Sequence, residues 1–105
     1  MQETTFIYLD DVRVPPSNEW LVVRTAEEAY TAVLASYKNG EEIVLSLDHD
    51  LGEDIPTGYD LLNWLEKDIV TDMTFRPNIS FLIHSANPVG RENMARAINA
   101  IRGLM

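Results

Sequence analysis

Residues 43–47 read Ile-Val-Leu-Ser-Leu, and Asp-His-Asp-Leu-Gly follows directly at residues 48–52. The first five residues are mostly β-branched or aliphatic, which predicts a strand buried on both faces. Ionisable side chains then end this strand abruptly. A buried strand followed by polar groups is typical of an α/β sheet, in which ligands bind outside the carboxyl ends of parallel strands.

The same pattern occurs on both sides of this stretch. Phe6-Ile7-Tyr8-Leu9 predicts a strand that stops at Asp10-Asp11, and residues 79–83 predict another that stops at His84-Ser85. Residues 20–23, Trp-Leu-Val-Val, predict a further strand. The two prolines in residues 11–19 make the segment before it a loop.

Helix signals separate the later strands. Residues 25–28 form a capping box that begins a helix, and Asn39-Gly40 ends it. A second helix follows Pro56-Thr57-Gly58. Asn87-Pro88 suits the start of a third helix, with Gly103 expected beyond its end.

This order of elements predicts one α/β domain over residues 1–105. Strands that alternate with helices imply a mostly parallel sheet of about four strands, covered by helices on both faces. The nine-residue loop at 11–19 is short for a parallel crossover. We therefore expect strand 20–23 to lie at an edge or to run antiparallel.

Composition narrows the function. Eight Lys and Arg against 17 Asp and Glu give a net charge of −9, which disfavours binding to duplex DNA or RNA. An acidic protein that handles phosphate needs a cation in between, so a divalent metal such as Mg²⁺ or Mn²⁺ is a candidate cofactor. The absence of cysteine excludes disulfides, thiolate catalysis and cysteine-ligated zinc. No signal peptide or membrane-length apolar run is visible, so we expect a cytoplasmic protein.

The three polar strand ends predict one site if their strands are parallel neighbours. Four carboxylates and both histidines then converge: Asp10, Asp11, Asp48, Asp50, His49 and His84. Carboxylates so close together raise each other's pKa values unless a cation lies among them. The candidates for this cation are a divalent metal, Arg13, Arg91 and a protonated histidine. The free amides at the start of the third helix are a natural seat for a phosphate.

Each of these residues also has a purely structural interpretation. Asp10 and Asp11 can cap a loop, residues 48–52 can form a hydrogen-bonded turn, and His84 can be a satisfied structural histidine. Asn87 suits a helix cap. Arg91 stands in the first turn of a helix, where a cation opposes the helix dipole, which favours an anionic partner. The tryptophans and tyrosines are interpreted as core residues.

With these residues in view, the chain resembles a receiver domain of two-component signalling. The acidic pair, the acceptor aspartate and the following hydroxyl of that family match Asp10-Asp11, Asp48 and Ser85. Receivers also need a lysine after their fifth strand, and the two lysines here, Lys38 and Lys67, lie in or beside predicted helices. The first receiver helix and the fifth strand have no counterpart among the predicted elements, so phosphoryl signalling is disfavoured.

A closer resemblance is to the cyclic-phosphate processing receiver domain, a degenerate receiver family of bacteria and phages. It rests on four segments: residues 9–16 with LDDVR and Pro15-Pro16, 47–52 (LDHDLG), 58–60 (GYD) and 84–94 (HSANPVGRENM). The resemblance implies a three-layer, flavodoxin-like fold. It further implies processing of cyclic phosphates on RNA ends, as in RNA repair, or on related nucleotides.

The family chemistry suggests roles for the clustered residues. Opening a 2′,3′-cyclic phosphate needs one group to activate water and another to protonate the leaving ribose oxygen, and His49 and His84 are the candidates. Arg13, Arg91, Ser85 and Asn87 are the predicted phosphate-binding residues. Asp10, Asp11, Asp48 and Asp50 are the predicted metal ligands, and Asp50 is the weakest of the four.

Other functions fit the same residues. The first alternative is a non-catalytic module that sequesters a cyclic nucleotide or caps a phosphate end, which predicts stabilisation by ligand without product. The second is an interaction module whose acidic surface covers a basic partner. A working phosphoryl receiver ranks last, because the lysine is missing.

Overall fold

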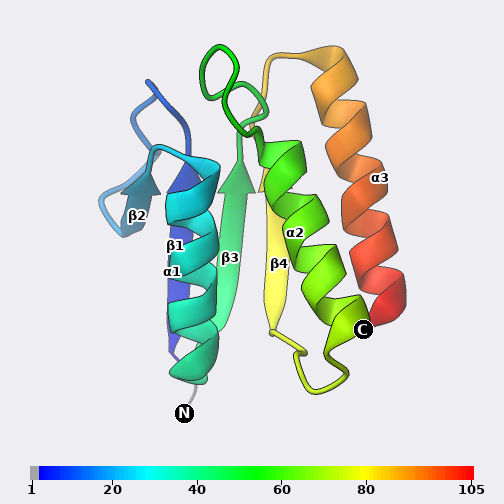
Figure 1. The fold of residues 1–105 in the computed structure, drawn as a ribbon. Helices are drawn as coiled ribbons and strands as arrows, with labels where there is room; N and C mark the ends of the chain where they lie inside the picture. The colour runs from blue at the N-terminus through cyan, green and yellow to red at the C-terminus, as the bar shows by residue number, and fades with distance from the viewer. Residues whose placement is uncertain (1–2) are drawn as a thin grey trace.

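The computed structural model describes residues 3–105 as one four-stranded, fully parallel sheet with three helices (Figure 1). In chain order the elements are β1 (Thr4–Leu9), β2 (Trp20–Val23), α1 (Ala26–Lys38), β3 (Glu42–Leu47), α2 (Gly58–Thr71), β4 (Ile79–Ile83) and α3 (Pro88–Leu104). The strand order is β2-β1-β3-β4. This confirms the α/β receiver-like fold class.

The loop between β1 and β2 does make a parallel connection. β2 lies at one edge of the sheet and pairs with β1 in parallel, with Phe6 opposite Trp20 and Leu9 opposite Val23. The edge position is therefore confirmed, and the antiparallel alternative is wrong. No helix lies between these two strands, as the comparison with receivers implied.

The helices begin where local chemistry satisfies free backbone amides. Thr25 accepts a hydrogen bond from the Glu28 amide, and Thr57 and Asp60 form a reciprocal capping box at the start of α2. Asn87 caps α3 by accepting from the Gly90 amide. Gly103 lies inside α3 and not beyond its end, which corrects the predicted boundary.

The arrangement of layers differs from the expected one. α1 contacts α2, and α2 contacts α3, so the helices form one layer against the sheet (Figure 1). The physical reason is that the crossovers β2–α1–β3 and β3–α2–β4 move in the same direction, and right-handed crossovers then place their helices on the same face. A helix between β1 and β2 would cover the other face, and the chain has none there.

The main core lies between the sheet and this helical layer. Ile7, Leu9, Leu45 and Leu47 are fully buried there against apolar residues of all three helices. By strand alternation and register, the opposite face carries Phe6, Tyr8, Trp20, Val22, Val44 and Leu82, none of which belongs to the main core cluster. Tyr8 is buried, as predicted, although it lies outside this cluster, whereas Trp20 is not a core residue, contrary to the prediction.

Aromatic contacts stabilise part of this open face. Trp20 meets the rings of Phe6 and Tyr8 edge-on, with ring centroids 5.3 and 5.8 Å away. The other tryptophan, Trp64, packs against the main core as predicted. Within residues 3–105 no helix is long and apolar enough to cross a membrane.

Candidate functional site

Parallel pairing brings the polar strand ends together. Leu9 of β1 lies opposite Leu47 of β3, so the residues that follow them, Asp10 and Asp48, leave the sheet side by side. The Asp48 amide donates to the Leu9 carbonyl at 3.0 Å, which fixes that alignment. Asp10, Asp11 and Asp48 each place a carboxylate oxygen within 4.8 Å of the others. The predicted acidic cluster therefore forms with three members.

Asp10 is the most constrained of the three, because its side chain is fully buried. Its Oδ1 accepts hydrogen bonds from the amides of Val12 at 2.9 Å and Arg13 at 2.8 Å. Its Oδ2 lies 3.0 Å from Nε2 of His84. Burial alone would raise the pKa of Asp10, but these amides and the His84 ring lower it overall. Asp10 is an aspartate in the folded protein.

His84 uses both of its ring nitrogens. Nε2 faces the Asp10 carboxylate, which only accepts, so the proton is on Nε2. Nδ1 therefore accepts from the Ser46 hydroxyl, 2.7 Å away. The ring also stacks on Tyr8, with centroids 4.3 Å apart. Burial lowers the pKa of His84, although the neighbouring Asp10 opposes this, so the ring is neutral near pH 7.

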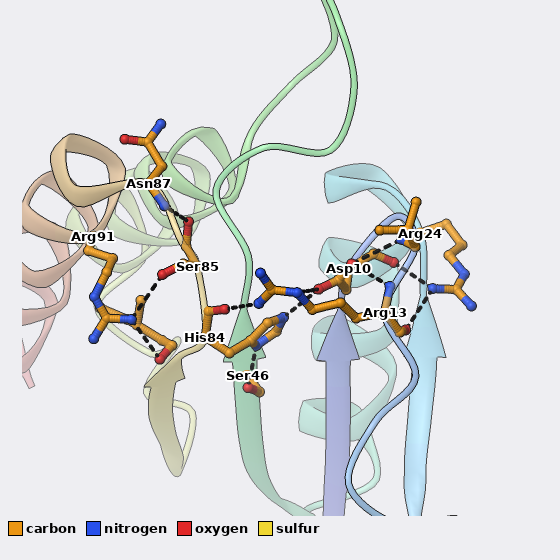
Figure 2. A network of polar contacts seen from close by, with 10 residues as sticks. Asp10, Arg13, Arg24, Ser46, His84, Ser85, Asn87 and Arg91 are labelled. Carbon is orange, nitrogen blue, oxygen red and sulfur yellow. Dashed lines mark hydrogen bonds and ion pairs between the residues drawn. The ribbon is translucent and has the colours of Figure 1, made fainter.

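Two arginines hold the loop that follows β1. Arg13 donates to the His84 carbonyl and lies near the Asp10 carboxylate, with its Nε 3.9 Å from Oδ2. Arg24, just after β2, donates to the carbonyls of Asp10 at 2.9 Å and Arg13 at 3.2 Å. Figure 2 shows this network extending from Arg24, after β2, across Asp10 to His84, after β4. The edge strand β2 thus contributes to the site through Arg24, whose hydrogen bonds hold the backbone of the loop after β1.

The negative charge of Asp48 is less well stabilised by its neighbours than that of Asp10. Burial raises the pKa of Asp48, and the charge of Asp10 raises it further, despite hydrogen bonds from the His49 amide and the Ser85 side chain. A cation beside both carboxylates would remove this penalty. Asp10 also has an unused lone pair, since three hydrogen bonds occupy three of its roughly four acceptor positions. The oxygen-rich trio fits a hard divalent cation such as Mg²⁺ or Mn²⁺.

Asp50 lies outside this trio and hydrogen-bonds to His49. Its Oδ1 is 2.9 Å from Nδ1 of His49, and its Oδ2 accepts from the Asn87 side chain at 3.2 Å. Hydrogen bonds from His49 and then Asn87 lower the pKa of Asp50. The proton of a neutral His49 is therefore on Nδ1, and Nε2 has no hydrogen-bonding partner among residues 3–105. His49 and His84 are in opposite tautomers.

Two glycines allow the His49 segment to pack closely. A Cβ at Gly90, in the first turn of α3, would lie 2.5 Å from Cγ of His49, so the ring rests directly on the helix backbone. A Cβ at Gly58 would lie 2.1 Å from the Asp48 carbonyl oxygen. Any larger residue at either position would displace the loop that carries Asp48 and His49.

The predicted phosphate-binding residues border the site, but they are bonded within the protein. Arg91 donates to the Ser85 carbonyl at 3.1 Å and to the Ile83 carbonyl at 3.4 Å (Figure 2). Ser85 Oγ accepts from the Asn87 amide at 3.1 Å. Asn87 caps α3 and also donates to Asp50. Arg91 thus contacts carbonyls and not a carboxylate of the cluster.

Sequence reasoning missed three residues of the site: Ser46, Tyr8 and Arg24. Ser46 carried a usable signal, because it is the single polar side chain within the apolar stretch 43–47 and is buried. Tyr8 and Arg24 carried none, because their roles depend on strand pairing. The side chain of Tyr8 lies on the same sheet face as Ser46, its partner in register, and His84 stacks there.

The fold and these strand ends define a receiver-like α/β domain with an acidic site at the carboxyl edge of its sheet. Comparison with known families agrees, because the model of the cyclic-phosphate processing receiver domain matches residues 5–100. The chain therefore belongs to that family. No curated protein and no solved structure matches it significantly.

Proposed function

We propose that this protein hydrolyses 2′,3′-cyclic phosphates, on nucleotides or on RNA ends, at the site formed by Asp10, Asp48 and His49. Membership of a family named for cyclic-phosphate processing supports the substrate class. The observation that carries the proposal is the contrast between two groups carried by consecutive residues, Asp48 and His49: an acidic trio suited to a cation, and a histidine whose Nε2 has no hydrogen-bonding partner among residues 3–105.

His49 is the proposed general base. Its Nδ1–H is held by Asp50, which leaves the lone pair of Nε2 available to accept a proton from water. That water forms a new bond to phosphorus while the bond from phosphorus to one ribose oxygen breaks. The ribose oxygen takes up a proton from solvent, so one water is consumed and the product is a phosphomonoester with a free ribose hydroxyl.

The acidic trio has a different role in this proposal. Asp10, Asp11 and Asp48 would hold a divalent cation, which would supply positive charge to the phosphoryl oxygens. Arg13, whose guanidinium is partly exposed beside Asp10, is a protein cation that could assist in this role. The first-turn amides of α3 are a second source of positive potential.

His84 is assigned to positioning and not to proton transfer. Both of its ring nitrogens are engaged, one by Asp10 and one by Ser46, and its pKa is lowered by burial. Its donated hydrogen bond and its stacking on Tyr8 hold the buried carboxylate of Asp10 in place. This revises the expectation that the two histidines share the acid and base roles.

The direct test is to incubate the protein with 2′,3′-cyclic mononucleotides and with a cyclic-phosphate-ended RNA, and to follow phosphorus NMR. Reactions with Mg²⁺, with Mn²⁺ and with EDTA are compared. We expect ring opening to a monoester, suppressed by EDTA. Glu27→Gln, on the exposed side of α1, is the matched control and should react like the wild type.

Two outcomes contradict the proposal. Thermal stabilisation by the cyclic nucleotide without any product would favour a sequestering module. Neither binding nor product with any of the three additions would remove cyclic phosphates as ligands of this site.

A further inference from the structure

β4 is an edge strand with a free side. The sheet order places β3 on one side of β4 and no strand on the other. Even-numbered residues bond to β3, since the His84 amide donates to Leu47 and the Asn78 carbonyl accepts from Ile43. In a parallel ladder the intervening residues Ile79, Phe81 and Ile83 then direct their backbone groups outward. The contact between Arg91 and the Ile83 carbonyl occurs on that side.

A groove follows this free edge. A cavity of about 260 Å³ lies between β4 and α3, lined by Phe81 and Leu82 on one side and by Ala95 and Ile98 on the other. Two arginines, Arg91 and Arg102, are also part of its lining, together with Ile83 and Asn99. The groove therefore combines a strand edge, an apolar floor and cationic side chains.

The charge of this region is opposite to that of the chain. α3 carries three of the eight cations, Arg91, Arg96 and Arg102, but only one of the 17 acidic residues, Glu92. Arg96 is neutralised by Glu92, with a contact of 2.6 Å. Arg102 is exposed, and its guanidinium has no hydrogen bond or ion pair with any residue from 3 to 105.

The other edge strand, β2, is better protected against the addition of a further strand than β4 is. β2 has four residues and follows a loop with two prolines, and Arg24 directly after it donates to the backbone of the β1–β2 loop. β4 has five residues, mostly apolar, and Leu82 is half exposed. Short edge strands discourage strand addition, and β2 is the shorter of the two edge strands.

We infer that the β4 edge and the groove beside α3 bind an extended acidic peptide segment of a partner protein, which adds as a fifth strand. Its backbone would pair with Ile79, with Phe81 and with the amide of Ile83, whose carbonyl already accepts from Arg91, and an apolar side chain would enter the groove. A carboxylate of the peptide would pair with Arg102. This site is separate from the acidic trio and does not depend on the proposed hydrolysis.

Charge favours this occupant over a second copy of the chain. A two-fold β4–β4 pairing would bring the α3 helices of both copies to one interface, with Arg91 and Arg102 duplicated there and Glu92 the one acidic residue of each helix. Like charges across such an interface oppose association. An acidic strand gains both the backbone ladder and the ion pair.

The test is a titration of the ¹⁵N-labelled chain with a nine-residue acetylated and amidated peptide, in which valine and threonine alternate between terminal glutamates. We expect the amide signals of Ile79, Phe81 and Ile83 to shift and their hydrogen exchange to slow. Arg102→Ala should weaken binding about two- to fivefold. Arg96→Ala, outside the groove on the same helix, should leave the affinity unchanged.

Two further peptides sharpen the result. Replacing the glutamates by glutamines should weaken binding by a factor similar to Arg102→Ala, and replacing the valines by prolines should abolish it, because proline cannot donate to the ladder. Unchanged β4 amides at millimolar peptide would overturn the inference, as would pairing at β2. Sedimentation showing β4-dependent self-association would instead identify a second copy as the occupant.

Discussion

His49 and His84 lie at the same edge of the sheet and have nearly equal side-chain exposure, 18% and 17%. They differ in their hydrogen bonds. His84 is bonded at both nitrogens and stacked on Tyr8, whereas His49 is bonded at Nδ1 alone. The difference teaches that exposure does not identify a catalytic histidine in this fold. The proposed role of His49 rests instead on the bonding of the second nitrogen, since a proton can be exchanged with substrate only where no protein group already occupies it.

The largest expected effect separates the two histidines by turnover. His49→Gln should lower the rate of cyclic-phosphate hydrolysis by about 10²–10⁴-fold, because it removes the proposed base. The melting temperature should change little, since glutamine can still hydrogen-bond to Asp50. Phosphorus NMR rates and a thermal melt on the same preparation check this. A variant that keeps wild-type turnover would eliminate His49 as the base.

Substitution of the other histidine, His84, should affect the stability of the fold. His84→Ala should lower the free energy of unfolding by about 2–4 kcal/mol, because it removes a hydrogen bond to a charged group and an aromatic stack and leaves the buried Asp10 carboxylate and Ser46 hydroxyl without their partner. Urea denaturation provides the measurement. Ser46→Ala, which removes only the Nδ1 partner, is the matched control and should cost about 1 kcal/mol. Equal stability losses in His49→Gln and His84→Ala would contradict the comparison.

Substitution of Asp48 in the acidic trio should have a smaller effect on the free energy of unfolding, and of opposite sign. Asp48→Asn should stabilise the metal-free protein by about 0.5–2 kcal/mol, since it removes a buried charge beside Asp10. It should also abolish the rise in melting temperature on adding Mg²⁺ or Mn²⁺, which we expect for the wild type. Differential scanning calorimetry with and without EDTA tests both parts. Destabilisation in EDTA would show that the charge of Asp48 is already compensated within the protein.

The smallest effect is a pH dependence of stability. Because the folded protein lowers the pKa of His84 below its unfolded value of about 6.5, the unfolded chain binds more protons just below that pH. The stability contributed by neutral His84 is thus complete above about pH 6.5 and decreases as the pH falls through the folded pKa. Asp10, whose pKa is also lowered, adds a further loss in more acidic solution, below its unfolded pKa of about 3.9.

Urea midpoints measured between pH 8 and pH 5 test this dependence. In His84→Gln the decrease just below pH 6.5 should disappear, whereas in His49→Gln it should persist. An unchanged slope in His84→Gln would mean that another group titrates in this range.

Much of the fold follows from local sequence, because hydrophobic periodicity and capping chemistry are local properties. The apolar runs at 6–9, 20–23, 43–47 and 79–83 all form strands, and Thr25, Thr57 and Asn87 cap the three helices. The convergence of Asp10, Asp11 and Asp48 also follows, because parallel strands end at one edge.

Tertiary structure alone decided the rest. The direction of β2 and the single helical layer depend on how crossovers close, which no local pattern encodes. The division of roles between the histidines depends on Ser46, a partner 38 residues from His84 in the chain, and on Asp10, 74 residues away. Asp50, by contrast, is the direct neighbour of His49 in the sequence. It hydrogen-bonds to His49 and does not join the acidic trio because Asn87, at the start of α3, donates to its second carboxylate oxygen. A sequence names the polar groups at a sheet edge, but only packing determines which of their hydrogen-bonding positions are filled by protein.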